Sequence, residues 1–471
     1  MLWQSGSRAW LGLICASLAA CSVGTPYRRP SVPLPTEWDA PVPSGANGER
    51  DASAGVWPQA DWWHGFGSAR LDELIGEAQR SNDDLAAAMA RVQEADAQLR
   101  IAGAPLLPTV DLGATATRER SSVLLGRPGV YDVFNPVLTA SYELDFWGKN
   151  RAARDAARAA AVASRFDQQT VALTVVSSVA TTYFQALELR DRLQVARHNL
   201  ENGEKILRGL TFEQEVGTAT GLDVAQQATV VALLYAAIPP LEQQLKQTVY
   251  ALGVLIGRAP ESIEVTEGTL TALKSPPVVA GLPSRLLSRR PDIAEAEQLL
   301  IAANANITVA RAELFPTIEL TASGGYESTM LSSLVSSANR AYALSGGLTQ
   351  PIFHGGALRG ELAYTKARYA ELASTYHKTV LSALSNVENA LVAAHQTADQ
   401  EERQAQAVSK AKRAYEYAQI QMSAGTVNIL TVLNTENALF GAQDTLVQVH
   451  YSRLQALVDL FTALGGGWQQ G

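Results

Sequence analysis

The sequence predicts an α+β protein made of two copies of one subdomain, and three observations support this. A single shift of 208 residues aligns the first half of the chain with the second half. Each half contains two segments of roughly ten residues in which apolar and polar side chains alternate, as in half-buried strands. Each half also contains a helical pattern of about 60 residues, far longer than the helices of an ordinary compact domain.

The internal repeat is visible in short motifs and in single glycines. The motif LLPTVDL at 106–112 aligns with LFPTIEL at 314–320, so Pro108 corresponds to Pro316, 208 residues later. The same shift pairs Asp84 with Asp292, Gly148 with Gly356, Gly217 with Gly425 and Gly257 with Gly465. The register holds without a gap from about 81–257 to about 289–465, so a whole subdomain is duplicated, and a short solenoid repeat does not fit this period.

The repeat sets the predicted domain limits. Residues 57–257 form the first repeat, and residues 289–471 form the second. The connecting segment, 258–288, reads as a linker because it contains four prolines, Pro260, Pro276, Pro277 and Pro283.

Each repeat begins with a helix and two strands. The helix runs from about Asn82 to Ala104 in the first copy and from Pro291 to Ala312 in the second; proline suits the first helical position. The strands are predicted at about 108–118 and 137–146 in the first repeat and at about 316–326 and 342–352 in the second. Their period-two pattern gives each strand two unlike faces.

A long helix and a returning helix complete each repeat. The long helix starts at Gly148 or Gly356 and runs to about Gly209 or Ser423, which at 1.5 Å per residue is roughly 90 Å. Glycine turns at Gly217 and Gly425 reverse the chain, and the returning helices end near Gly257 and Gly465. In the first copy, the Pro239–Pro240 pair is expected to kink or break the returning helix.

The N-terminus predicts export and a lipid anchor. Arg8 precedes a short apolar stretch, and residues 1–20 read as a signal peptide that ends in Leu-Ala-Ala before Cys21. This arrangement is typical of bacterial lipoproteins, so we expect Cys21 to be acylated. Ser22 follows the cysteine, which favours export to the outer membrane. Residues 21–56 are rich in proline, glycine and serine and predict an extended tether.

Composition and motifs argue against several classes of function. A net charge of −8 provides no basic surplus for nucleic acid. No Walker loop, Gly-x-Ser-x-Gly or His-Glu-x-x-His motif occurs, and no two of the six histidines are four residues apart. The only cysteine besides Cys21 is Cys15 in the signal peptide, so the predicted mature chain has no zinc-cluster pattern. We therefore expect no enzyme activity, metal or cofactor.

The length of the predicted strands raises the question of whether they cross a membrane. They are long enough to cross a bilayer when tilted, and the sequence shows no uninterrupted apolar run of 18 residues after the signal peptide. A membrane-spanning sheet must close into a barrel, and about eight strands is the minimum. Four strands per chain would therefore require several chains: a dimer gives eight strands and a trimer 12. The alternative is a four-stranded sheet in a soluble periplasmic protein.

Four further motifs resemble a known family. They are GLPSRLLSRRPDI at 281–293, ARAELFP at 310–316, ELDFWG at 143–148 and ALGGGW at 463–468. With them the chain, over about 57–468, resembles TolC/OprM-type outer-membrane efflux lipoproteins, the NodT-like outer-membrane factors of resistance–nodulation–division pumps.

The resemblance implies an architecture, a location and a function. It implies a homotrimer with a 12-stranded outer-membrane β-barrel that continues into a long periplasmic α-helical barrel, with the linker in an equatorial region. It implies a passive exit duct for small molecules or drugs in a tripartite efflux system, with no cofactor. A periplasmic adaptor and an inner-membrane pump would contact the hairpin tips, about 213–220 and 421–428. The alternatives are a type I protein-secretion channel and a periplasmic structural lipoprotein without a pore.

The resemblance also implies a gate at the hairpin ends, just beyond Gly217 and Gly425. Asp223 matches a family aspartate that helps to latch the closed state, and Leu430 matches an apolar constriction residue. Three positions depart from the family pattern: Thr431 and Asn434 where relatives often carry aspartate, and Asn437 where a basic residue is common. The sequence therefore predicts that an acidic ring at the gate is weak or absent.

Overall fold

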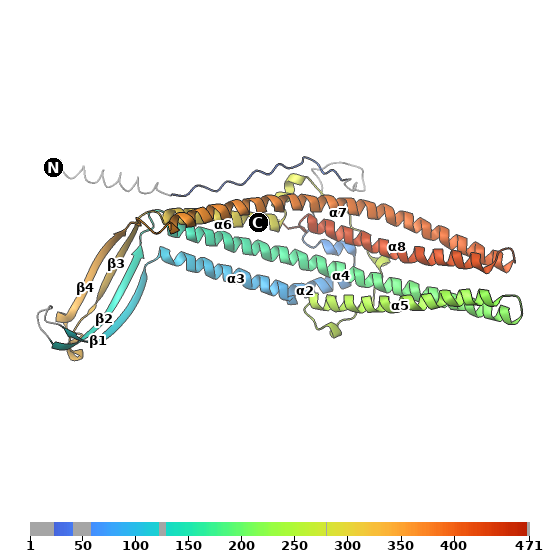
Figure 1. Cartoon of the computed structure of the whole chain (residues 1–471), viewed down its shortest axis with the longest axis horizontal. Coiled ribbons are helices and arrows are strands. Elements are labelled where there is room, and N and C mark those ends of the chain that lie inside the picture. The colour runs from blue at the N-terminus through green and yellow to red at the C-terminus, as the bar shows by residue number, and fades with distance from the viewer. Residues whose placement is uncertain (1–22, 41–57, 122–128, 279, 469–471) are drawn as a thin grey trace. The chain divides into compact units, whose positions relative to one another are not determined.

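The computed structural model describes residues 23–40, 58–121, 129–278 and 280–468 (Figure 1). The predicted signal peptide and Cys21 lie outside these ranges, as does part of the predicted tether. The chain divides into two compact units. Unit 1 comprises residues 1–31, 90–165 and 295–377, and unit 2 comprises residues 32–89, 166–294 and 378–471.

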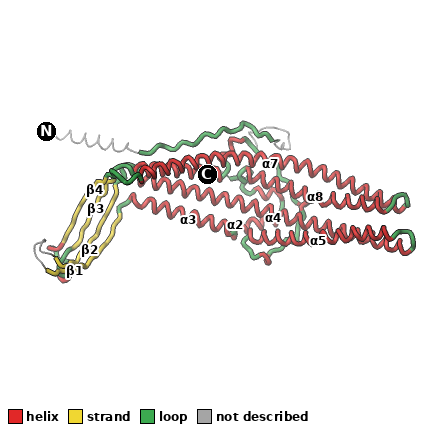
Figure 2. The backbone as a smooth tube through the Cα atoms, in the orientation of Figure 1, coloured by secondary structure: helices red, strands yellow, loops and turns green. Residues whose placement is uncertain are grey.

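Helices make up most of the described chain, and the strands form one sheet in unit 1 (Figure 2). The elements in chain order are α2 (Ala69–Ser81), α3 (Asp83–Gly103), β1 (Thr109–Ser121), β2 (Gly129–Glu143), α4 (Lys149–Glu215), α5 (Gly221–Leu255), α6 (Pro291–Ala312), β3 (Thr317–Tyr326), β4 (Arg340–Thr349), α7 (Ala357–Ser423) and α8 (Ile429–Ala463). The segment between α5 and α6 includes the short 3₁₀ helices Pro260–Ser262, Leu270–Ala272 and Pro283–Ser288.

The predicted duplication is present in the element lengths. Helices α4 and α7 are both 67 residues long, and α5 and α8 are both 35 residues long. The first residues of α4 and α7, Lys149 and Ala357, are 208 residues apart. The first residues of α5 and α8, Gly221 and Ile429, are also 208 residues apart. At 1.5 Å per residue, a 67-residue helix is roughly 100 Å long.

The sheet is antiparallel throughout, in the order β1-β2-β3-β4. Pairing of β1 with β2 runs from Thr109 opposite Ser141 to Ser121 opposite Gly129. β2 therefore begins eight residues before the predicted start near 137. Pro136, which faces Ala114, interrupts the strand pattern in the sequence because proline is disfavoured inside a strand.

The sequence predicted a kink or a break in the first returning helix at the Pro239–Pro240 pair. The Pro239–Pro240 pair does not break α5, which is helical from Gly221 to Leu255. Partly buried Ile238 and buried Leu241, on either side of the pair, pack against Leu189 and Leu193 of α4. This packing holds the helix together although each proline lacks the N–H that would donate a helical hydrogen bond.

Two of the helices combine great length with an apolar segment. Helices α4 and α5 are each long and apolar enough to cross a membrane, judged by length and composition only. In α4, 44 % of the apolar window is buried within the chain, but in α5 only 17 % is buried. A sequence scan for uninterrupted apolar runs misses such helices because polar residues interrupt them. Apolar helix surface left exposed in one chain is surface that an assembly can cover.

Two equivalent glycines allow close backbone approach in unit 2. Gly257 and Gly465 both have positive φ, at 70° and 89°. A Cβ atom at Gly257 would lie 2.1 Å from the carbonyl oxygen of Ser81, and one at Gly465 would lie 1.9 Å from that of Arg289. Ser81 and Arg289 are themselves 208 residues apart. Each repeat therefore closes through the same contact, between the glycine just after its returning helix and the residue two positions before α3 or α6.

Candidate functional site

The two hairpin turns have the same backbone construction. Gly217 and Gly425 adopt φ values of 79° and 71°. The N–H of Thr218 donates to Glu213 O at 2.8 Å, and the N–H of Thr426 donates to Gln421 O at 2.9 Å. These are the hydrogen bonds of a Schellman-type helix end, which needs a left-handed residue and favours glycine. A Cβ atom at either glycine would meet no atom within 4 Å, so the backbone conformation is what requires glycine.

Asp223 is engaged in capping its own helix. Its carboxylate accepts hydrogen bonds from the Thr220 N–H at 2.8 Å and from the Thr220 hydroxyl at 2.7 Å. In return, the Asp223 N–H donates to Thr220 Oγ1 at 3.2 Å, which completes a capping box at the start of α5. The side-chain and backbone hydrogen bonds from Thr220 lower the pKa of Asp223. The carboxylate is thus ionised and held at the N-terminus of α5 within one chain.

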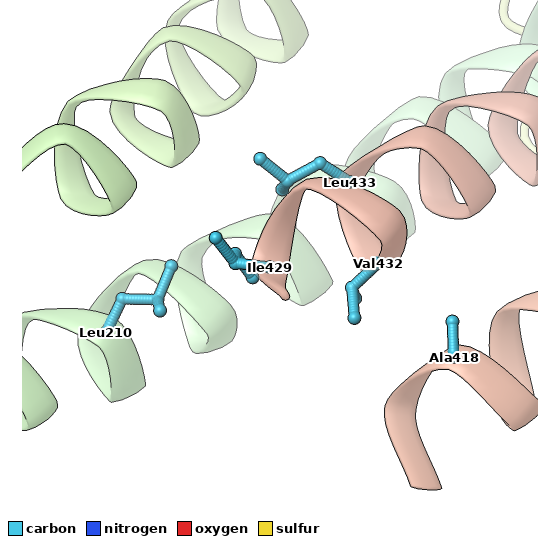
Figure 3. Packing of buried hydrophobic residues seen from close by; sticks show 5 residues of the cluster. All are labelled: Leu210, Ala418, Ile429, Val432 and Leu433. Atoms are coloured by element: carbon cyan, nitrogen blue, oxygen red, sulfur yellow. The ribbon is translucent and has the colours of Figure 1, made fainter. Parts of the chain in front are cut away.

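A hydrophobic cluster joins the ends of the two hairpins (Figure 3). Leu210 of α4 and Ala418 of α7 pack with Ile429, Val432 and Leu433 of α8. Partly buried side chains surround them: Ile206, Ala219, Val224, Tyr415 and Met422. The cluster contains residues from both repeats. Separating the hairpins at their ends would expose this apolar surface to water, at a cost of roughly 25 cal/mol per Å².

The other predicted gate residues lie on the exposed side of α8. Leu430 is 47 % exposed, and Thr431, Asn434 and Asn437 are also exposed. Positions 430, 434 and 437 recur at the spacing of one helix face, whereas the clustered residues 429, 432 and 433 occupy the buried face. α8 therefore presents Leu430, Asn434 and Asn437 as one uncharged strip. Asp223 lies on the other hairpin.

Glu436 is a residue of this region that sequence reasoning missed. Its relative exposure is 0 %, and neither carboxylate oxygen has a hydrogen-bond partner among the described residues. Burial raises the pKa of Glu436 to about 7. Burial, and secondly the charge of Glu436, raises the pKa of Tyr415 on α7 to about 12. The helical spacing from Ile429, Val432 and Leu433 puts residue 436 on the buried face, and this signal could have found it.

An ion pair ties the two repeats together farther along the helices. Arg192 of α4 donates to Asp444 of α8 through Nε at 2.7 Å and through Nη2 at 3.2 Å, a bidentate arrangement. Its Nη1 also donates to Glu188 at 3.1 Å. Arg192 and Glu188 are largely buried, so this network is screened less than an exposed pair.

The sheet of unit 1 has one apolar and one polar face. On one face, cross-strand rows run Val110–Ala140–Ala322–Leu344 and Leu112–Leu138–Gly324–Tyr342. On the other face, rows run Thr109–Ser141–Thr321–Ser345 and Asp111–Thr139–Ser323–Ala343. The apolar face is uncovered in the single chain; Leu112 is 78 % exposed and Tyr342 is 86 % exposed.

The unpaired edges of the sheet are a second feature, besides its two unlike faces, that a barrel segment requires. β1 and β4 each pair on one side only within the described chain. An amphipathic sheet with two unpaired edges is the geometry of a barrel segment, which must be completed by other copies before it can enter hydrocarbon.

The profile of the outer membrane efflux protein family matches residues 74–258 and 282–466. The chain belongs to the outer membrane efflux protein family. The two matched ranges begin and end 208 residues apart (282 − 74 and 466 − 258), the shift found within the sequence.

Curated relatives and solved structures agree with this assignment. The chain is 40 % identical to the pyoverdine export outer membrane protein OpmQ of Pseudomonas putida over 96 % of each chain. It is 32 % identical to the cation efflux system protein CusC of Escherichia coli, over 97 % of this chain and 98 % of CusC. A solved structure of CusC matches with a TM-score of 0.85 at 29 % identity, covering 95 % of this chain and 100 % of that one.

These findings confirm the family resemblance and the predicted fold class, a trimeric outer-membrane β-barrel continuous with a periplasmic α-helical barrel and built from duplicated protomers. They also support an outer-membrane location and a tripartite system. The predicted domain limits, the gate residues and the lipid on Cys21 stay predictions.

Proposed function

We propose that this protein is the outer-membrane exit duct of a tripartite efflux system for small molecules. The observation that carries the proposal is the four-stranded amphipathic sheet with two unpaired edges, in a family of outer-membrane efflux proteins. Three chains supply 12 strands whose apolar faces contact lipid and whose polar faces line a pore. Relatives are named for export of pyoverdine, cations and toluene, which favours small substrates over secreted proteins.

The hairpin ends form the gate of the duct. Leu430, Thr431, Asn434 and Asn437 on α8 line the constriction, and Asp223 helps to hold the first hairpin in its closed packing. An adaptor and a pump dock near 213–220 and 421–428, around Gly217 and Gly425. Docking selects a packing in which the hairpins separate, a population shift between two arrangements of the same helices.

Transport through the duct is passive, and the energy comes from the pump. The protein contributes a water-filled path and no chemistry, so it needs no cofactor. The lipid on Cys21 anchors the N-terminus in the inner leaflet of the outer membrane.

Conductance in planar lipid bilayers tests this function. The purified trimer should produce discrete current steps, and Leu430→Ala should increase the probability or size of the open steps by relaxing the constriction. Leu381→Ala, a leucine of matched exposure on α7 far from the hairpin ends, serves as the control. A purified, folded trimer that never conducts, with either leucine replaced or with none, contradicts the proposal.

A further inference from the structure

Unit 1 contains a basic groove between the N-terminal segment, α6 and α7. It measures about 440 Å³, the size of a small-molecule site. Arg28, Arg311 and Lys366 line it together with Asn304, Tyr369 and the buried Ile307. None of the described lining residues is acidic. Three cations therefore face one open space with no carboxylate among them.

The groove is built by residues 23–29, which run along α6 in an extended form. The carbonyl oxygen of Val23 accepts from Arg311 Nη1 at 2.7 Å, and that of Thr25 accepts from Asn304 Nδ2 at 3.1 Å. A Cβ atom at Gly24 would lie 2.6 Å from Thr308 Oγ1, so the backbone approaches the helix closely there. These contacts fix one wall of the groove.

The ion pair between Arg29 and Glu297 does not neutralise the positive charges that line the groove. Arg29 donates to Glu297 through Nε at 2.6 Å and is bonded to it also through Nη2. Glu297 is thus occupied by Arg29, a residue that does not line the groove. The carboxylates Glu313 and Glu361 line a separate pocket between α6 and α7. Arg28, Arg311 and Lys366 remain available to an anion.

The position of the groove along the chain determines which anion can reach it. Val23 is two residues from Cys21, at most roughly 7 Å of extended chain. Arg311 lies six residues before β3, which starts at Thr317. Under the proposed function, on which this step rests, Cys21 carries acyl chains in the inner leaflet and β3 spans the membrane. The groove then lies beside the phosphates of that leaflet.

We propose that this groove binds the phosphate headgroup of an anionic phospholipid of the inner leaflet. Arg311 uses one Nη for Val23 and keeps its other N–H groups for phosphate oxygens, which guanidinium binds in a bidentate manner. Arg28 and Lys366 add positive charge, and the Tyr369 hydroxyl and the Asn304 amide suit the hydroxyls of a glycerol headgroup. The bound lipid holds the N-terminal segment against α6 and α7.

Binding of a short-chain lipid to the intact trimer tests the proposal. The probe is dihexanoyl phosphatidylglycerol, with dihexanoyl phosphatidylcholine as the zwitterionic comparison, measured by native mass spectrometry and titration. The Arg28→Ala/Lys366→Ala double variant should bind phosphatidylglycerol roughly thirtyfold more weakly, since each cation near an anionic lipid surface contributes a few-fold in affinity. The matched control, Lys378→Ala/Arg413→Ala, removes the same charge at exposed positions of α7 and should bind normally.

Three results would overturn the proposal: equal binding of the two lipids, an equal loss in the control variant, or full displacement of the lipid by millimolar inorganic phosphate, which would indicate a plain anion site. The titration is repeated with Cys21→Ala protein, because a short-chain lipid reaches the groove without the anchor. Loss of conductance in bilayers would count against the duct, whereas loss of lipid selectivity would count against the groove, so the two failures are distinguishable.

Discussion

Glu436 gives the structure a pH-dependent weakness at the hairpin ends. Its carboxyl is fully buried, lacks hydrogen-bond partners among the described residues and has its pKa raised from 4.5 to about 7 by burial. Because the folded-state pKa lies above the unfolded one, the stability is greatest below about pH 4.5, falls as the pH rises and levels off above about 7. A shift of this size corresponds to about 3 kcal/mol.

Replacing Glu436 by glutamine removes the charge and keeps the shape. At pH 8.5, Glu436→Gln should stabilise the packed hairpins by up to about 3 kcal/mol, which is about a hundredfold lower population of the open state. At pH 5 the wild-type carboxyl is already mostly protonated, so the variant should gain little. The affected amides are those of α8 near Ile429, Val432 and Leu433, which pack in the same region.

Hydrogen exchange measured on the purified trimer provides the assay. Wild type and variant are compared at the same pH, so the intrinsic exchange rate cancels, and the ratio of protection for residues 429–440 is read at pH 5 and 8.5. Glu416→Gln, an exposed carboxylate on α7, is the control and should change neither ratio. A gain that is equal at both pH values, or larger at pH 5, would refute the reasoning.

Three further predictions concern other parts of the chain. Gly465→Ala should lower the free energy of unfolding by at least about 2 kcal/mol, because a Cβ atom there meets the backbone of Arg289, and should reduce the yield of trimer on native gels. Its control is Gly209→Ala in α4, which has open space around it and should raise the melting temperature. Arg192→Ala should lower the melting temperature measured by the loss of helical circular dichroism, because Glu188 stays buried without its partner. Arg197→Ala removes an exposed ion pair with Glu242 and should leave the melting temperature nearly unchanged. Cys21→Ala should abolish incorporation of radioactive palmitate, and persistent labelling would exclude acylation at this residue.

Much of the fold could be predicted because the sequence pattern of each main element occurs twice, once in each repeat. The strand faces, the long helices and the glycine turns at Gly217 and Gly425 follow from periodicity and from residues that tolerate positive φ. The short helix α2, from Ala69 to Ser81, was not predicted; the 208-residue shift places the 3₁₀ helix Pro283–Ser288 opposite its second half.

Local rules failed where tertiary packing decides the outcome. Pro136 hid the first half of β2, although the pairing of β2 with β1 continues through it. The Pro239–Pro240 pair suggested a break, although the packing of α5 against α4 keeps the helix continuous. The burial of Glu436 depends on neighbours from other helices, so only its helical phase was available in the sequence.

The residues of the proposed gate show the same limit of prediction from sequence. The sequence predicted a weak or absent acidic ring, from Thr431 and Asn434 where relatives often carry aspartate and from Asn437 where a basic residue is common. All three side chains are exposed on α8. The capping bond between Asp223 and Thr220 could also be read from their three-residue spacing, yet the spacing does not say whether the carboxylate serves the helix or a neighbouring chain.

The unpaired edges of β1 and β4 have a genetic consequence. A subunit whose β4 edge could not pair, for example through a proline placed in that strand, would still supply a normal β1 edge to a neighbour and would enter mixed rings. When damaged and normal copies are made in equal amounts and mix at random, only roughly one ring in eight contains three normal copies. Such an allele would therefore be dominant over the normal one, and raising the expression of the normal allele would restore efflux only gradually.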